Sequence, residues 1–277
     1  MSKDFILNTA RNEQLHITAY GLENLKSKAC LIFVHGFKGF KDWGFGPYLG
    51  EYFGSNGFFV LTFNFSHNGI GDKLTEFTEL NKFAQNTFSL EIEELSELIS
   101  AYLNGYFGAI SNKKIGLLGH SRGGAISLLT ARQINDVNAV AVWSSISKLD
   151  RYSDKQKEKW REKGYFEVFN TRTRQKMKLN LSLLEDIEKN ENNSLNLEKA
   201  VRELGRPLLI AHGEQDIAVP IKEAEQLYEW SNKNITEFHR IGSVGHTFNM
   251  KHPFEGSNSK FEELLKITKN FFINNLS

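Results

Sequence analysis

The sequence predicts an α/β fold, with a mostly parallel central sheet and helices on both faces. Two observations predict it. Short apolar runs alternate with helix-period segments along the 277 residues, which is the order that a parallel sheet with crossover helices requires. Three of the apolar runs, 30–34, 139–143 and 207–212, are nearly continuous, as expected for strands covered on both faces.

The strands and helices follow from the spacing of the apolar residues. The expected strands are Leu15–Tyr20, Cys30–Val34, Phe58–Phe63, Lys114–Leu118, Ala139–Trp143, Pro207–His212 and Glu237–Ile241. Apolar residues recur at spacings of three and four over 88–102, 221–228 and 261–271, which predicts three helices packed on the sheet.

One segment, 146–204, interrupts this alternation. It contains about two helix-like stretches and a possible hairpin, and no apolar run that would continue the sheet. We therefore expect a core of residues 1–145 and 205–277, with residues 146–204 inserted as a cap or lid after the strand that ends at Trp143.

The charge and the aromatic residues of this insertion allow two interpretations each. Eleven basic against five acidic residues over 148–178 could attract an anionic substrate or a coenzyme A thioester, although such a stretch is usually a solvated helix face. Its aromatic residues could line an acyl pocket or anchor the cap to the core. They are Tyr152, Trp160, Tyr165, Phe166 and Phe169.

Composition excludes several classes of partner. Lysine and arginine number 34 against 33 aspartates and glutamates, so no strong field indicates nucleic acid or an anionic membrane. The single cysteine, Cys30, lies in an apolar run and is expected to be a buried thiol. With neither a signal-peptide pattern nor a run of about 20 apolar residues, a soluble cytoplasmic protein is expected.

A serine lies between a strand and a helix in a Gly-X-Ser-X-Gly pattern. The strand ending at Leu118 leads into Gly119-His120-Ser121-Arg122-Gly123, and a helix-like stretch, 125–133, follows. This is the arrangement of a nucleophile elbow, where side chains two before and two after the serine would collide with neighbouring backbone. Ser121 is therefore the candidate nucleophile.

A serine nucleophile needs a base and an acid that orients the base. Asp216 follows the strand 207–212, and His246 follows the strand 237–241, so both belong to the carboxyl edge where open α/β sheets build their sites. Glu214 and Asp150 are alternative acids, and His252 is an alternative base. His35, His120 and His212 are interpreted as hydrogen-bonded structural residues.

The third requirement is a pair of donors for the oxyanion of the tetrahedral intermediate. His35-Gly36-Phe37 follows the strand 30–34, and Gly36 allows the backbone to turn so that the Phe37 amide points into the site. The Arg122 amide, directly after the nucleophile, is the expected second donor.

Together, His35-Gly36-Phe37, the elbow at Ser121, Asp216 and His246 resemble the α/β-hydrolase superfamily over nearly the whole chain. The His-Gly-Phe opening and the insertion after Trp143 are similar to bacterial dienelactone-hydrolase-like and cinnamoyl (feruloyl) esterases, in some of which an insertion covers the acyl pocket. The resemblance implies an α/β-hydrolase fold, the triad Ser121, Asp216 and His246, and the two oxyanion amides.

The expected function is hydrolysis of small-molecule carboxylic esters through an acyl-enzyme, without metal or other cofactor. A thioesterase or a peptidase-like acyl hydrolase would use the same triad. Haloalkane dehalogenases and epoxide hydrolases need a carboxylate where Ser121 stands, and a non-catalytic binding protein on this fold is expected to have lost part of the triad. The acyl group, the alcohol and the oligomeric state stay open.

Overall fold

The computed structural model describes residues 2–73 and 75–276, and within them eight strands form one sheet in the order β1-β2-β4-β3-β5-β6-β9-β10. The strand pairs β1–β2 and β2–β4 are antiparallel, and all the other neighbours in this sheet are parallel. The strands are β1 (Ser2–Asn8), β2 (Gln14–Tyr20), β3 (Cys30–Val34), β4 (Phe59–Asn64), β5 (Ile115–His120), β6 (Val137–Trp143), β9 (Leu208–Gly213) and β10 (Thr236–Ile241).

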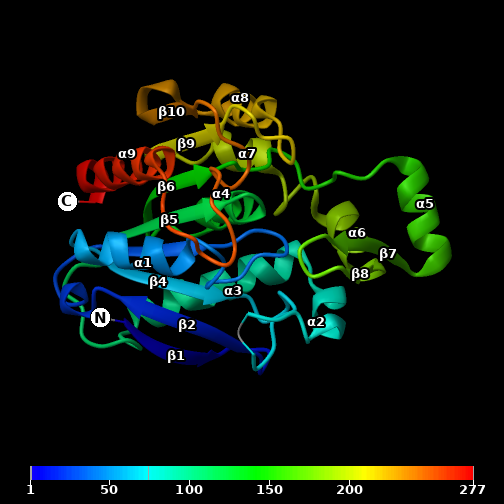
Figure 1. Ribbon diagram of the computed structural model, residues 1–277, viewed down its shortest axis with the longest axis horizontal. Coiled ribbons are helices and arrows are strands. Elements are labelled where there is room, and N and C mark those ends of the chain that lie inside the picture. The colour runs from blue at the N-terminus through cyan, green and yellow to red at the C-terminus, as the bar shows by residue number, and fades with distance from the viewer. Residues whose placement is uncertain (1, 74, 277) are drawn as a thin grey trace.

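Helices cover both faces of this sheet (Figure 1). The helices are α1 (Gly46–Ser55), α2 (Leu80–Gln85), α3 (Phe88–Leu103), α4 (Arg122–Gln133), α5 (Asp154–Lys163), α6 (Leu181–Asn190), α7 (Leu197–Arg202), α8 (Ile221–Trp230) and α9 (Ser259–Leu276). Strand β3 shows how the core divides. Leu31 and Phe33 pack in the cluster that holds α1 and α9, whereas Ile32 and Val34 pack in the cluster that holds α3 and α4, because successive side chains of a strand point to opposite faces.

The predicted fold class is confirmed, and the seven expected strands are present with ends that differ by at most two residues. Three elements of the core were not expected: strand β1 and helices α1 and α2. No helix in the described part of the chain is long and apolar enough to cross a membrane.

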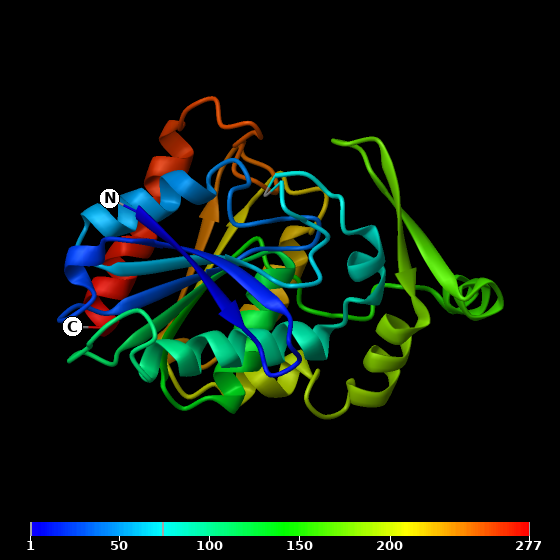
Figure 2. The ribbon, with the colours of Figure 1, turned by 90° about the horizontal axis from the view of Figure 1, so that it is seen from below.

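Between β6 and β9 the chain leaves the sheet. This segment contains α5, a hairpin of β7 (Tyr165–Asn170) and β8 (Gln175–Asn180), and then α6 and α7, so it has one helix more than the two expected. As predicted, it adds no strand to the large sheet. Figure 2 shows α5 and the hairpin projecting away from the sheet.

The carboxyl ends of the parallel strands share one edge of the sheet. The loops after β3, β5, β9 and β10 therefore meet there. These loops carry Phe37, Ser121, Asp216 and His246 respectively.

Candidate active site

Ser121 lies in a tight turn between β5 and α4. Its backbone has φ 57° and ψ −123°, a conformation that residues with a side chain rarely adopt. A Cβ on Gly119 would lie 2.3 Å from the Gly123 carbonyl oxygen, and a Cβ on Gly123 would lie 2.1 Å from the Val34 carbonyl oxygen. Only glycine therefore fits at these two positions, for the reason that the sequence pattern suggested.

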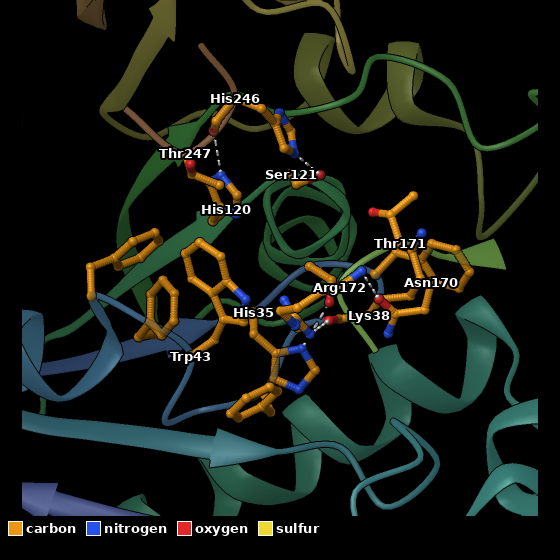
Figure 3. A pocket seen from close by; sticks show the side chains of 16 residues that line it. His35, Lys38, Trp43, His120, Ser121, Asn170, Thr171, Arg172, His246 and Thr247 are labelled. Carbon is orange, nitrogen blue, oxygen red and sulfur yellow. Dashed lines mark hydrogen bonds between the residues drawn. The ribbon is translucent and has the colours of Figure 1, made fainter. Parts of the chain in front are cut away.

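Three side chains that are far apart in the chain meet at this turn. Ser121 Oγ lies 3.0 Å from His246 Nε2 (Figure 3), and His246 Nδ1 lies 2.7 Å from Asp216 Oδ2. With its proton on Nδ1, the imidazole donates to the carboxylate and leaves the Nε2 lone pair facing the serine hydroxyl. The structure thus brings the predicted serine, histidine and aspartate into one hydrogen-bonded chain.

Asp216 is a buried carboxylate that several donors hold. Burial by itself raises the pKa of this carboxyl, but hydrogen bonds from His212, His246 and the Val219 amide, with the charge of His246, hold the pKa well below its usual range. The bond from His212 is the weakest of these, because His212 Nε2 lies 3.4 Å from Asp216 Oδ2 and 2.8 Å from the Val219 carbonyl. Asp216 therefore stays ionised beside His246.

Two further histidines fix the backbone around the serine. His120 Nε2 donates to the His246 carbonyl over 2.9 Å, and His35 Nδ1 donates to the Gly36 carbonyl over 3.0 Å. Burial, with the nearby His246, lowers the pKa of His120 to about 3, and burial lowers the pKa of His35 to about 4. Both imidazoles are therefore neutral at pH 7 and act as hydrogen-bonding structural groups.

The two expected oxyanion residues lie next to the serine. A Cβ on Gly36 would lie 2.9 Å from Ser121 Cβ and 3.4 Å from its Oγ, so the loop after β3 passes directly against the nucleophile, and Phe37 is the next residue. The Arg122 amide is the first of α4 and has no partner within the helix.

The alternative acids and base do not join this chain of hydrogen bonds. Glu214 is exposed, Asp150 forms an ion pair with Lys157, and His252 Nδ1 accepts from a backbone amide over 2.9 Å. Among the residues that the structure describes, no group of three or more His, Cys, Asp or Glu side chains could hold a metal ion.

A cavity of about 200 Å³ opens beside Ser121. Its walls come from the loop after β3, from the loop after β10 and from the turn of the β7–β8 hairpin. The sequence did not single out Lys38, Asn170, Thr171 or Arg172, which line it (Figure 3). The only signal in the sequence was the excess of basic residues in the inserted segment.

The aromatic residues of the inserted segment do not line this cavity in the described structure. Trp160 is fully buried, and its ring centroid lies 4.9 Å from that of Tyr152 and 5.3 Å from that of Phe166. Of the two interpretations that the sequence left open, the structure supports the second, because this cluster packs the segment together and onto the main core.

Known proteins agree with this architecture. Residues 30–198 match the model of the alpha/beta hydrolase fold family. No curated protein matches the sequence. Solved structures that superpose on the chain include the esterase domain of a Rhodothermus marinus protein (TM-score 0.68, 18% identity, 100% of both chains covered). Two others are Est1E from Butyrivibrio proteoclasticus with bound ferulic acid (0.73, 18%, 98% of both chains) and a putative hydrolase from Agrobacterium vitis S4 (0.73, 16%, 98% of both chains).

At these identities the structural likeness shows the fold alone, whereas the family match spans more than half of the chain. The resemblance seen in the serine, aspartate and histidine loops is thereby confirmed at the level of the superfamily. The chain belongs to the α/β-hydrolase fold family.

Proposed function

We propose that this protein is a serine hydrolase that cleaves carboxylic esters through an acyl-enzyme. The observation that carries the proposal is the chain of hydrogen bonds from Ser121 Oγ to His246 Nε2 and from His246 Nδ1 to Asp216 Oδ2. A serine hydroxyl becomes an effective nucleophile when a positioned base removes its proton. The ionised Asp216 holds the tautomer of His246 that can do so.

In this mechanism Ser121 Oγ attacks the ester carbonyl carbon while His246 takes the hydroxyl proton. The amides of Phe37 and Arg122 donate to the oxyanion, and the amino-terminal dipole of α4 favours the same negative charge. The intermediate then collapses, the C–O bond breaks, and the alcohol leaves with the proton from His246. Water, deprotonated by His246, attacks the acyl-enzyme in the same way and releases the acid.

The same triad can hydrolyse esters, thioesters and amides. We choose esters because esterases are among the similar solved structures. Alcohols and thiols are better leaving groups than amines, so esters and thioesters make the smaller demand on this site. A panel of matched ester, thioester and amide substrates separates the three possibilities.

We also propose that residues 146–204 form a cap over the site, with residues 1–145 and 205–277 as the core. The proposal is supported by the β7–β8 hairpin, whose residues 170–172 line the cavity beside Ser121. A cap that supplies part of the wall can select the substrate as well as exclude water.

The test of the proposed function is labelling with a fluorophosphonate probe, mapping of the modified peptide by mass spectrometry, and p-nitrophenyl ester hydrolysis. We expect the label on Ser121 and a loss of turnover of several orders of magnitude in Ser121→Ala, because triad residues act as a unit. Ser100→Ala, an exposed position on α3, is the matched control and should behave like wild type. Unchanged activity in Ser121→Ala would refute the proposal.

A further inference from the structure

The cavity beside Ser121 contains positive charge without negative charge. Its described lining includes Lys38 and Arg172 and no aspartate or glutamate. Figure 3 shows the two cations together on one part of the wall, with Ser121 and His246 on another. They come from different parts of the molecule, because Lys38 follows β3 in the core and Arg172 lies in the β7–β8 turn.

Each of the two cations donates a hydrogen bond to a backbone carbonyl instead of forming an ion pair with a carboxylate. Lys38 Nζ donates to the Phe169 carbonyl over 3.2 Å, and one Arg172 Nη donates to the Lys38 carbonyl over 3.2 Å. In the described part of the chain neither side chain forms a salt bridge. An ammonium has three donors and a guanidinium five, so both cations retain donors for a ligand.

The two positive charges repel each other. Lys38 is half-buried and Arg172 is exposed, so solvent screens part of this repulsion. Partial burial and the neighbouring Arg172 lower the pKa of Lys38, and partial burial lowers the pKa of Arg172. Other basic residues of the inserted segment pair with carboxylates, as Arg161 does with Glu188 and Lys176 with Glu167. Lys38 and Arg172, in contrast, place two like charges beside each other with no ion-pair partner in the described part of the chain, and an anion bound between them would relieve their repulsion.

The setting of Arg172 suits a carboxylate. Its guanidinium carbon lies 5.7 Å from the ring centroid of Phe40, 5.8 Å from that of Trp43 and 5.9 Å from that of Phe77. Rings around a guanidinium hold its planar fork in place, and that fork matches the two oxygens of a carboxylate.

We propose that Lys38 and Arg172 form a subsite for a carboxylate, so that the favoured substrate is an ester that carries a free carboxylate on its acyl or its alcohol half. This inference rests on the proposed ester hydrolysis and names its substrate class. The core loop that supplies Phe37 and the cap turn that supplies Arg172 would then close on the same anion.

The test uses two pairs of esters that differ only in charge. For the acyl half they are p-nitrophenyl hydrogen adipate and its methyl ester. For the alcohol half they are 4-carboxyphenyl butyrate and its methyl ester. The readout is the ratio of kcat/KM for the anionic and the neutral member, compared among wild type, Arg172→Gln, Arg172→Lys and Lys38→Gln. Differences in intrinsic reactivity cancel in this comparison.

We expect Arg172→Gln and Lys38→Gln to lower the ratio roughly tenfold or more in one of the two pairs, mainly through KM, because each removes a charged hydrogen bond to the anion. Arg172→Lys should restore part of the preference. Arg174→Gln is the matched control, since Arg174 is an exposed residue of the same turn that does not line the cavity, and it should keep the wild-type ratio. The pair that responds identifies the half of the ester that carries the carboxylate.

Failure of the subsite and failure of the proposed function give different results. If wild type hydrolyses the neutral esters and Arg172→Gln has the same ratios as Arg174→Gln, the carboxylate subsite is wrong and ester hydrolysis stands. If no ester is hydrolysed, binding of adipate to Ser121→Ala, measured by calorimetry, decides the subsite alone. If adipate binds to Ser121→Ala and the further change Arg172→Gln weakens this binding tenfold, the subsite is supported. If adipate does not bind to Ser121→Ala, the subsite is wrong.

Discussion

Phe37 and Arg122, the residues proposed to supply the oxyanion amides, contact each other through their side chains. The Arg122 guanidinium carbon lies 4.2 Å from the ring centroid of Phe37 and 4.7 Å from that of Phe88. Its Nη1 lies 3.4 Å from Glu91 Oε1, with both side chains buried. Burial raises the pKa of Glu91 and the Arg122 charge opposes this shift. One buried cation thus packs the loop after β3 against the start of α4, the two segments from which the proposed oxyanion amides come.

Also at the scale of single residues, Asp216→Asn tests which acid orients His246. An asparagine amide can donate to Nδ1 and so favour the tautomer with its proton on Nε2, which cannot accept the Ser121 proton. We expect kcat for p-nitrophenyl ester hydrolysis to fall by roughly 10³ to 10⁴-fold. Glu214→Gln is the matched control and should change kcat by less than about threefold, because Glu214 is exposed and has no bond to His246. Equal losses in both variants would contradict the assignment of Asp216.

At the scale of elements, the three elements that the sequence analysis missed were missed for different reasons. Strand β1 is mostly exposed, and its apolar run is only the three residues 5–7. Helix α1 was missed because of its glycines, which weaken helix propensity. A Cβ on Gly50 would lie 2.4 Å from the Tyr20 ring and one on Gly54 would lie 2.9 Å from the Gly21 nitrogen, so these glycines serve the packing of α1 against β2. Helix α2 has only six residues, too few for a periodic stripe.

The inserted segment makes a prediction at the same scale. Trp160 holds α5 against the β7–β8 hairpin through Tyr152 and Phe166, so Trp160→Ala should remove about 3–5 kcal/mol of packing energy from this segment. We expect hydrogen exchange to accelerate across 152–180 while β5 and β6 keep their protection. Phe169→Ala is the matched control, since the Phe169 side chain is 51% exposed. Equal loss of protection throughout the sheet would show that the segment does not unfold separately.

At the scale of the whole molecule, the sequence could predict the serine, histidine and aspartate but not the wall around them. Ser121 is marked by a local pattern, and the fold class by itself brings the ends of β5, β9 and β10 together. The bond from Arg172 to the Lys38 carbonyl joins residues 134 apart and depends on where the hairpin folds back. No periodicity or motif in the sequence predicts that contact, so the two cations of the cavity could be identified only from the three-dimensional structure.

The stability of the whole molecule should depend on pH through two buried groups whose pKa values are shifted in opposite directions. His120 has a pKa of about 3 in the folded chain, and Glu94, raised by burial, has a pKa of about 7. Between pH 7 and 5 the unfolded chain protonates its histidines while folded His120 stays neutral, so this residue makes stability fall as pH falls. Folded Glu94 takes up a proton over the same interval while the unfolded glutamate stays ionised, so Glu94 makes stability rise as pH falls.

Two single variants separate these contributions. His120→Gln keeps a donor for the His246 carbonyl and removes the titration, so on acidification from pH 7 to 5 it should lose roughly 2 kcal/mol less unfolding free energy than wild type. Glu94→Gln should lose roughly 2 kcal/mol more than wild type over the same interval, because it cannot take up the stabilising proton. Urea unfolding at both pH values measures the differences. Each variant is the control for the other, since a general destabilisation would shift both in the same direction at both pH values. If the unfolding free energies of the wild type and of both variants change equally between pH 7 and 5, the pKa values of His120 and Glu94 do not differ between the folded and unfolded chains, and the prediction is wrong.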